Sequence, residues 1–375
     1  MAQPTFIAIA DVHLGAKLYN IPELAEDLKE DFKRAVDLAI AKKVKYLVIA
    51  GDLFDSNKPT PDLVDFVAEQ VEKAGSNGCI VTGIAGDHDK PINSSSWIHL
   101  SGVVPIMDLN EPSFLGFDYC DTSMDNIQKI IDYPNKQHVE WIFLHGQVPE
   151  LFSFVEEKKK LDFKEVDLIN TYPKLKGVIL GDIHTTSESV IHDPKMVRTT
   201  LPYIGYCGSL GMVKPKEVGH KKGLLYYDGE KLSRLKFEMT RKCIKLNLAD
   251  SIEPINWISK YTNFFKDNKG KKPLFIVEYD SSSEHLLAKA SPLFEVGLVR
   301  TAHVKFKGAA AQGEDEGETI NIRSELNTEG RIDKVLKQVL TNKTAYDLAA
   351  ALLSNDDATA ILDKFKQDTL EENEQ

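Results

Sequence analysis

The sequence predicts an α/β fold in which helices flank a largely parallel sheet. Apolar runs of strand length alternate with longer segments whose apolar residues recur at helical spacing. Strands are expected at 5–10, 46–50 and 79–85, with helices between them at about 22–42 and 61–74. The apolar stripe of the first helix repeats every four residues, at Leu24, Leu28, Phe32, Val36 and Ile40. This βαβαβ order is typical of parallel strands joined by crossover helices.

Later segments continue this pattern as far as residue 244. Apolar strands are expected at 140–144 and 177–180. Residues 223–227 and 231–237 flank Asp228-Gly229, a pair that favours a tight hairpin turn. We therefore expect one α/β domain over residues 1–244.

A smaller unit is expected from residue 245 onward. Its predicted elements are a helix at 252–265, a strand at 274–279, a helix at 283–290 and a strand at 298–306. Gly, Ala, Gln and Glu dominate the stretch that follows, a composition typical of a flexible linker. The predicted division is 1–244, a small α+β domain at 245–307, a linker at 308–330 and C-terminal helices at 331–375.

Composition limits the class and the compartment of the protein. Of the 375 residues, 42% are hydrophobic, which is ample for a buried core, yet no apolar run reaches the roughly 18 residues of a membrane span. The N-terminus lacks a cleavable signal pattern, and the four cysteines form no CxxC pair. We expect no membrane association and a cytoplasmic location, in a bacterial or virus-infected bacterial cytosol.

Charge is distributed unevenly along the chain. The net charge of −11 argues mildly against a nucleic-acid-binding protein. Residues 214–245, however, carry ten Lys or Arg against four Asp or Glu. A charge run alone more often marks a solvated surface. Because this run follows the motifs described next, its lysines are also candidates for phosphate contacts, namely Lys214, Lys216, Lys221 and Lys222.

Five short motifs directly follow apolar strands. They are Asp11-Val-His13, Gly51-Asp52-Leu-Phe-Asp55, Gly86-Asp87-His88-Asp89, His145-Gly146 and Gly181-Asp182-Ile-His184. The carboxyl ends of parallel strands meet at one edge of a sheet, where α/β proteins bind ligands. Each motif alone is more often a turn, a helix cap or a core histidine. Five in succession at strand ends instead predict one site rich in carboxylates and imidazoles.

Such a site suits the hydrolysis of a phosphoester by two divalent ions. This reaction needs a nucleophile at neutral pH and neutralisation of charge on the phosphoryl oxygens. Two metals ~3.5–4 Å apart supply both. Carboxylates and imidazoles are ligands of first-row divalent metals, so the residue types agree with this chemistry.

The order of the motifs resembles that of the calcineurin-like metallophosphoesterase superfamily, across about residues 5–210. That family's motifs read Asp-x-His, Gly-Asp-x-x-Asp, Gly-Asn-His-Asp/Glu, a single His and Gly-His-x-His. This sequence departs at two positions, with Asp87 in place of Asn and Asp182 in place of the first His of the last motif. The resemblance implies a metallophosphoesterase sheet sandwich flanked by helices.

Within this superfamily the chain is most similar to SbcD-type nuclease subunits of double-strand-break repair. The similarity lies in residues 53–60 and in Tyr206-Cys-Gly208-Ser209, and no Arg follows Asp52 as in the protein phosphatases. The elements expected after residue 245 are similar to that family's DNA-capping domain and to helices that dock an SMC-like ATPase. The resemblance therefore implies an exonuclease and endonuclease on DNA ends or hairpins. DNA and an SMC-like ATPase are its expected partners, and a homodimer is a further option.

The resemblance also implies a role for each motif residue. The ligands of the two ions would be Asp11, His13 and His184 for the first, Asp87, His145 and Asp182 for the second, and Asp52 as the bridge. His88 would contact the scissile phosphate and help the leaving oxygen depart. Asp89 would orient the His88 imidazole.

Two aspartates at unusual positions bear on the metal and on the function. Carboxylates are hard donors, so Asp87 and Asp182 favour Mn²⁺, with Mg²⁺ as the alternative, over Zn²⁺. Two other functions stay open. One is a small-molecule phosphomonoesterase or phosphodiesterase, and the other is a DNA-binding subunit whose catalysis the two aspartates have weakened.

Overall fold

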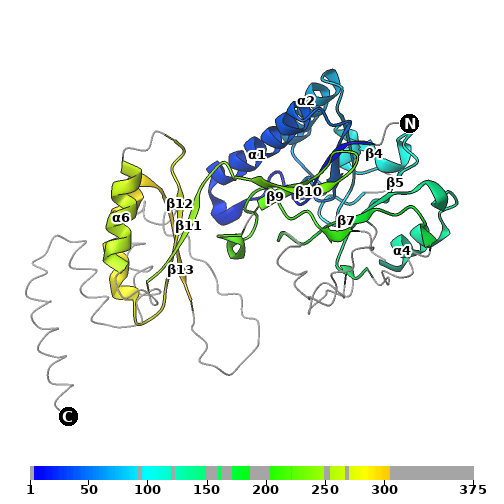
Figure 1. Cartoon of the computed structure of the whole chain (residues 1–375). Coiled ribbons are helices and arrows are strands. Elements are labelled where there is room, and N and C mark those ends of the chain that lie inside the picture. Colours follow the sequence, from blue (N-terminus) through cyan, green and yellow to red (C-terminus); the bar gives the residue numbers. More distant parts are fainter. Residues whose placement is uncertain are drawn as a thin grey trace, which may run out of the picture. The chain divides into compact units, whose positions relative to one another are not determined.

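The computed structural model describes residues 4–91, 95–119, 123–148, 159–161, 171–185, 203–220, 222–248, 254–266 and 270–304. Its helices and strands are drawn in Figure 1. The chain divides into two units between Ile244 and Lys245.

The first unit contains a six-stranded sheet of order β10-β9-β1-β2-β3-β4. Its parallel strands are β1 (Phe6–Ile9), β2 (Tyr46–Ala50), β3 (Ile80–Ile84) and β4 (Val104–Pro105). On the other side, β9 (Lys222–Tyr227) runs antiparallel to β1 and pairs with β10 (Leu232–Phe237). The crossovers that connect β1, β2 and β3 are the predicted helices α1 (Pro22–Ala41) and α2 (Pro61–Ser76).

A second sheet of the first unit has four parallel strands in the order β5-β6-β7-β8. They are β5 (Phe114–Gly116), β6 (Trp141–His145), β7 (Gly177–Gly181) and β8 (Tyr203–Tyr206). The short helix α3 (Trp97–Leu100) lies between β3 and β4 in the chain, and α4 (Ser123–Asp132) lies between β5 and β6.

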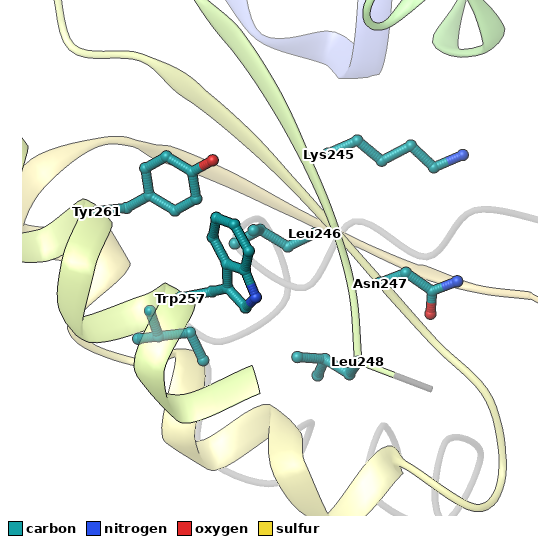
Figure 2. A pocket seen from close by; sticks show the side chains of 7 residues that line it. Lys245, Leu246, Asn247, Leu248, Trp257 and Tyr261 are labelled. Carbon is teal, nitrogen blue, oxygen red and sulfur yellow. The ribbon is translucent and has the colours of Figure 1, made fainter. Parts of the chain in front are cut away.

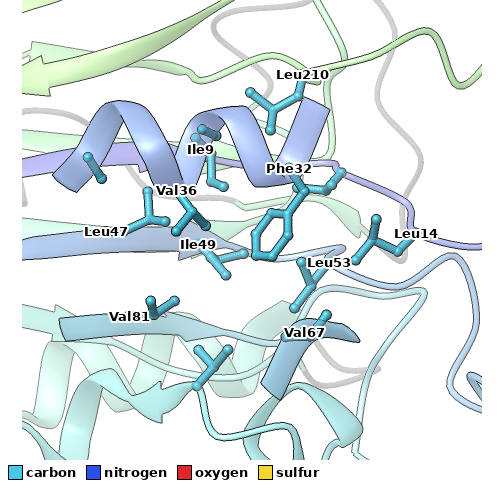
Figure 3. Packing of buried hydrophobic residues seen from close by; sticks show 14 of the residues in the cluster. Ile9, Leu14, Phe32, Val36, Leu47, Ile49, Leu53, Val67, Val81 and Leu210 are labelled. Atoms are coloured by element: carbon cyan, nitrogen blue, oxygen red, sulfur yellow. The ribbon is translucent and has the colours of Figure 1, made fainter. Parts of the chain in front are cut away.

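Alternation along β1 shows how the two sheets are layered. Ile7 and Ile9 join a core with α1 and α2, whereas Phe6 and Ala8 join a core with residues of the second sheet. In the first core, Phe32 and Val36 of α1 pack over strand residues such as Ile49 (Figure 3). In the second core, the Phe6 ring meets the Trp141 ring at a centroid distance of 5.0 Å. The predicted sheet sandwich flanked by helices is therefore confirmed.

The second unit begins within β11 (Cys243–Asn247), which pairs in a three-stranded sheet of order β11-β12-β13. The other strands, β12 (Leu274–Tyr279) and β13 (Leu298–His303), are parallel. Helix α6 (Pro254–Lys266) packs Trp257, Ile258 and Tyr261 beside β11. These side chains line a shallow pocket of about 240 Å³ with residues 245–248 (Figure 2).

One described element differs in type from the prediction. The segment expected as a helix at 283–290 is a 3-10 helix, η7 (Glu284–Ala290), followed by α7 (Leu293–Val296). The Asp280 carboxylate accepts hydrogen bonds from the backbone N of Ser282 and Ser283, which fixes a turn at its start. The linker at 308–330 and the helices at 331–375 lie outside the described residues. Among the described helices, none is both long and apolar enough to cross a membrane.

Candidate metal centre

The five strand-end motifs meet at one place in the first unit. They follow β1, β2 and β3 of one sheet and end or follow β6 and β7 of the other. The loops are linked directly, because the backbone N of Asp11 donates to the carbonyl of Gly51 and the backbone N of Asp182 donates to the Asp11 carboxylate at 2.9 Å. The predicted convergence of strand ends is thus seen in the structure.

One group of ligand atoms comprises Asp11, His13 and His184, here called the first donor set. These atoms lie within 4.8 Å of one another, and all three residues are buried. Nε2 of His13 and Nε2 of His184 are only 3.2 Å apart. Two imidazole nitrogens at this distance, beside a carboxylate, form the arrangement that a shared divalent ion would need.

Outer partners orient both imidazoles of the first donor set. Nδ1 of His13 lies 3.1 Å from Oδ1 of Asp55, and Nδ1 of His184 lies 2.6 Å from Oε1 of Glu217. A proton held on each Nδ1 leaves each Nε2 with its lone pair directed at the site. Carboxylates behind metal-binding imidazoles commonly play this part.

Replacing Glu217 with glutamine is expected to weaken both the fold and the first donor set. The Glu217 side chain is buried and accepts from the Lys222 ammonium at 2.8 Å. Burial would raise its pKa, but the hydrogen bond with His184 and the charge of Lys222 lower it to about 2. Without the carboxylate, a buried ammonium loses its counter-charge, which costs roughly 3–5 kcal/mol of unfolding free energy. Metal affinity is expected to fall by about 10–100-fold.

Urea unfolding and Mn²⁺ calorimetry measure the two effects of Glu217→Gln separately. Glu111→Gln is the matched control, since Glu111 also accepts from a lysine but lies outside the donor sets. Equal Mn²⁺ affinities in Glu217→Gln and Glu111→Gln would contradict the orienting role of Glu217.

A second group comprises Asp87, His145 and Asp182, here called the second donor set, whose ligand atoms also lie within 4.8 Å of one another. Nδ1 of His145 donates to the carbonyl of Ala50 at 3.0 Å, so Nε2 faces the carboxylates. Asp52 lies between the sets: its Oδ2 is 3.3 Å from Nε2 of His145 and 3.5 Å from Nε2 of His13. This is the position that a bridging carboxylate requires.

Two properties of the buried carboxylates fit divalent ions. Oδ2 of Asp11 is buried and has no hydrogen-bond partner among the described residues, and burial raises the pKa of this carboxyl to about 7. Burial alone would lower the pKa of His145, but Asp52 and Asp87 raise it well above its ordinary value. The His145 shift reports the negative charge of the carboxylates around it, which divalent cations would offset.

Backbone conformation is unusual at four of the donors. Asp11, His13, Asp52 and Asp182 have φ values of 52°, 50°, 52° and 94°, in the left-handed region that few non-glycine residues adopt. Strained residues of this kind concentrate at functional sites. Gly86 makes the close packing feasible, since a Cβ there would lie 2.1 Å from Oδ1 of Asp52.

His88 lies beside His13 and Asp52 with its side chain partly exposed. Its backbone N donates to Oδ1 of Asp52 at 2.9 Å, and its Nδ1 donates to the carbonyl of Asp55 at 3.0 Å. Its ring meets the His13 ring edge-to-face at 4.6 Å. Within the described part of the chain, Nε2 has no hydrogen-bond partner, so this atom is available to a substrate.

The expected role of Asp89 was wrong. Its carboxylate is buried and accepts from the backbone N of Phe54 at 3.0 Å and of Gly86 at 2.6 Å, so it fixes two loops rather than the His88 ring. The backbone carbonyl of Asp55 orients His88 instead. Two residues that are adjacent in sequence lie in the same loop, but their side chains need not hydrogen-bond to each other.

The four candidate lysines occupy different environments. Lys214 is exposed, whereas Lys222 is buried and its ammonium contacts Glu217 and Ser209, which is not the surface position expected for a phosphate contact. Lys221 and the side chain of Lys216 lie outside the described residues.

Four partners of the site were not predicted from the sequence. Glu217 and Lys159 have no motif around them, so no sequence signal marks them. Gln147, whose side-chain amide donates to Oδ2 of Asp182 at 2.6 Å, directly follows His145-Gly146. Asp55 is the last residue of its own motif, so the positions of both could have indicated them.

Comparisons with known proteins agree with this geometry. The calcineurin-like phosphoesterase family matches residues 4–186. The DNA double-strand break repair protein Mre11 of Archaeoglobus fulgidus is 37% identical over 95 residues, 25% of this chain and 21% of its own length. The Sulfurisphaera tokodaii protein of that name is 35% identical over 92 residues, 24% of either chain.

A longer match is more distant. The Mre11 protein of Thermoplasma acidophilum is 22% identical over 300 residues, 72% of this chain and 75% of its own length. The matches at higher identity thus span only about a fifth to a quarter of those relatives. The family match and the strand-end motifs cover the same part of the first unit. Residues 4–186 are therefore a calcineurin-like metallophosphoesterase domain.

Proposed function

We propose that the chain is a metal-dependent DNA nuclease that acts as an exonuclease and endonuclease on DNA ends or hairpins. The observation that carries this proposal is the place of His88, whose ring contacts His13 and lies within ligand-atom distance of His13 and Asp52. A site that only held structural ions would have no need of a partly exposed imidazole there. Similarity to DNA repair proteins supports DNA as the substrate.

Each group of side chains has a part in the proposed hydrolysis. Divalent ions, when bound, would supply a nucleophile at neutral pH and neutralise charge on the phosphoryl oxygens. The first donor set and Asp52 would hold one ion, and the second donor set with Asp52 the other. Because Nδ1 of His88 is held by the Asp55 carbonyl, Nε2 is the atom that would contact the phosphate and pass a proton to the leaving oxygen. Mn²⁺ is the proposed ion and Mg²⁺ the alternative.

One assay separates this function from its competitors. Purified protein with Mn²⁺ is tested on a double-stranded DNA end, a DNA hairpin and bis-p-nitrophenyl phosphate. Cleavage of DNA is the expected result. Cleavage of the small diester alone would favour a small-molecule phosphoesterase. No cleavage of any substrate, with DNA still bound, would favour a binding subunit with weakened catalysis.

DNA binding is expected to weaken steeply with salt, because lysines such as the exposed Lys214 would displace counterions from the phosphates. Lys214→Ala should make the slope of log K against log[salt] less steep by about one unit, the contribution of one phosphate contact. Fluorescence anisotropy with a labelled duplex measures the slope, and Lys236→Ala serves as the control, since Lys236 already pairs with Glu238. A flat plot for the parent protein would contradict this electrostatic contribution.

The proposal extends to an assembly with an SMC-like ATPase, with homodimerisation as a further option. The residues assigned to docking, 331–375, lie outside the described part of the chain. Co-purification of the ATPase with the full chain, and its loss after truncation at 318, is the expected result. An ATPase that stays bound to the truncated chain would refute docking through these residues.

A further inference from the structure

The side chain of Lys159 reaches into the second donor set. Its Nζ lies 2.8 Å from Oδ2 of Asp87 and 2.7 Å from Oδ1 of Asp182. A divalent ion ligated by these two aspartates would need the same carboxylate oxygens that the Lys159 ammonium contacts. Among the described residues, no lysine or arginine makes a similar contact with the first donor set.

The chain positions Lys159 firmly at this place. The backbone N of Gln147 donates to the carbonyl of Lys159, and the backbone N of Leu161 donates to the carbonyl of Gln147, both at 2.7 Å. Leu161 is buried in the core of the second sheet. At Gly146, a Cβ would lie 2.8 Å from the Lys159 carbonyl, so glycine allows this close approach. These contacts tie the lysine to the end of β6, beside His145.

Charge explains why an ammonium is stable there. Asp52, Asp87 and Asp182 gather around the single imidazole of His145. A lysine ammonium keeps its proton at neutral pH, since its ordinary pKa is about 10.4. Lys159 therefore places a positive charge between Asp87 and Asp182. It offsets one negative charge of the two aspartates that depart from the superfamily's motifs.

We propose that Lys159 is a counter-cation built into the second donor set and that it competes there with the second divalent ion. The two sites then differ in affinity. An ion enters the first donor set readily, whereas the second set binds an ion only when the Lys159 ammonium is displaced. This inference rests on the same metal ligands as the proposed nuclease function, but it concerns only how tightly they bind metal.

The test is a titration of the metal-free full chain with Mn²⁺, followed by calorimetry and by the electron paramagnetic resonance of bound Mn²⁺. The parent is expected to show one tight ion and a second that binds at least about tenfold more weakly. Lys159→Met removes the charge and keeps the side-chain length, so it should tighten the second site by about tenfold or more. Lys176→Met is the matched control, because Lys176 also pairs with a partly buried carboxylate, Glu140, away from the donor sets.

Thermal unfolding separates competition from a merely structural role. Without metal, Lys159→Met should melt below the parent, since Asp87 and Asp182 then repel each other without compensation. With saturating Mn²⁺ its midpoint should rise by more than that of the parent, whereas a structural role would lower both midpoints equally. Equal affinities of the two Mn²⁺ ions in the parent protein would overturn the proposal. The Mn²⁺ titration of the parent alone gives this result, without any variant. Altered Mn²⁺ binding in a chain that cuts no DNA would leave the proposal standing and refute only the nuclease function.

Discussion

Replacing His88 with alanine is expected to lower phosphodiester turnover by about 10²–10⁴-fold, the usual contribution of a positioned acid or base. Nδ1 of the imidazole is held by the Asp55 carbonyl, and the residue lies within ligand-atom distance of His13 and Asp52. Because the ring is partly exposed and is not part of the core, the fold should be kept. Initial rates with Mn²⁺ on DNA and on bis-p-nitrophenyl phosphate measure the loss.

The metal stoichiometry of His88→Ala decides between two roles for this residue. His88 also lies within 4.8 Å of His13 and Asp52 in ligand-atom distance, so it is placed well enough to be a ligand. We expect Mn²⁺ binding unchanged from the parent, as in the control His138→Ala, whose histidine is exposed and lies outside both donor sets. Loss of a bound ion in His88→Ala alone would make His88 a ligand instead.

Replacing Asp52 with asparagine is expected to lower turnover by about 10³-fold or more and to weaken both ions at once. Its carboxylate faces His13 of one donor set and His145 of the other, so a single change removes negative charge from both. A metal-bound site typically contributes several kcal/mol of charge stabilisation, and each 1.36 kcal/mol corresponds to about tenfold in rate.

Asp31→Asn is the matched control for Asp52→Asn. Asp31 is also a buried carboxylate, but it accepts hydrogen bonds from Thr240 and lies outside the donor sets. Mn²⁺ calorimetry should show weaker binding in Asp52→Asn and parental binding in Asp31→Asn. If Asp52→Asn weakened only one ion, Asp52 would be a ligand of one site rather than the bridge.

Sequence patterns predicted the parts of the fold that depend on local periodicity. The apolar stripe of α1 marked the face that packs on the sheet, and Phe32 and Val36 on it are fully buried. Parallel strands share a carboxyl edge, so the motif residues could be assigned to one place without knowledge of any distance. The short strands β4 and β5, of two and three residues, carry too few residues for a periodic signal.

The partners behind the donors could not be predicted in this way. Glu217 ends the 3-10 helix η6 (Pro215–Glu217) and Lys159 lies between β6 and β7, and their contacts depend on how these segments pack rather than on a neighbouring motif. Asp89 shows the opposite error, since its place in a motif suggested a contact that its buried carboxylate does not make. Hydrogen bonds between loops far apart in sequence are set by tertiary packing.

The location of bound metal tests the central claim most directly, namely that the strand-end residues of the first unit hold catalytic divalent ions. Crystals of the parent protein soaked in Mn²⁺ would be measured for anomalous scattering. A strong peak is expected among Asp11, His13 and His184 and beside Asp52, with a weaker one at the second donor set that strengthens in Lys159→Met. Absence of any peak at these residues, or Mn²⁺ bound only elsewhere on the chain, would contradict the claim.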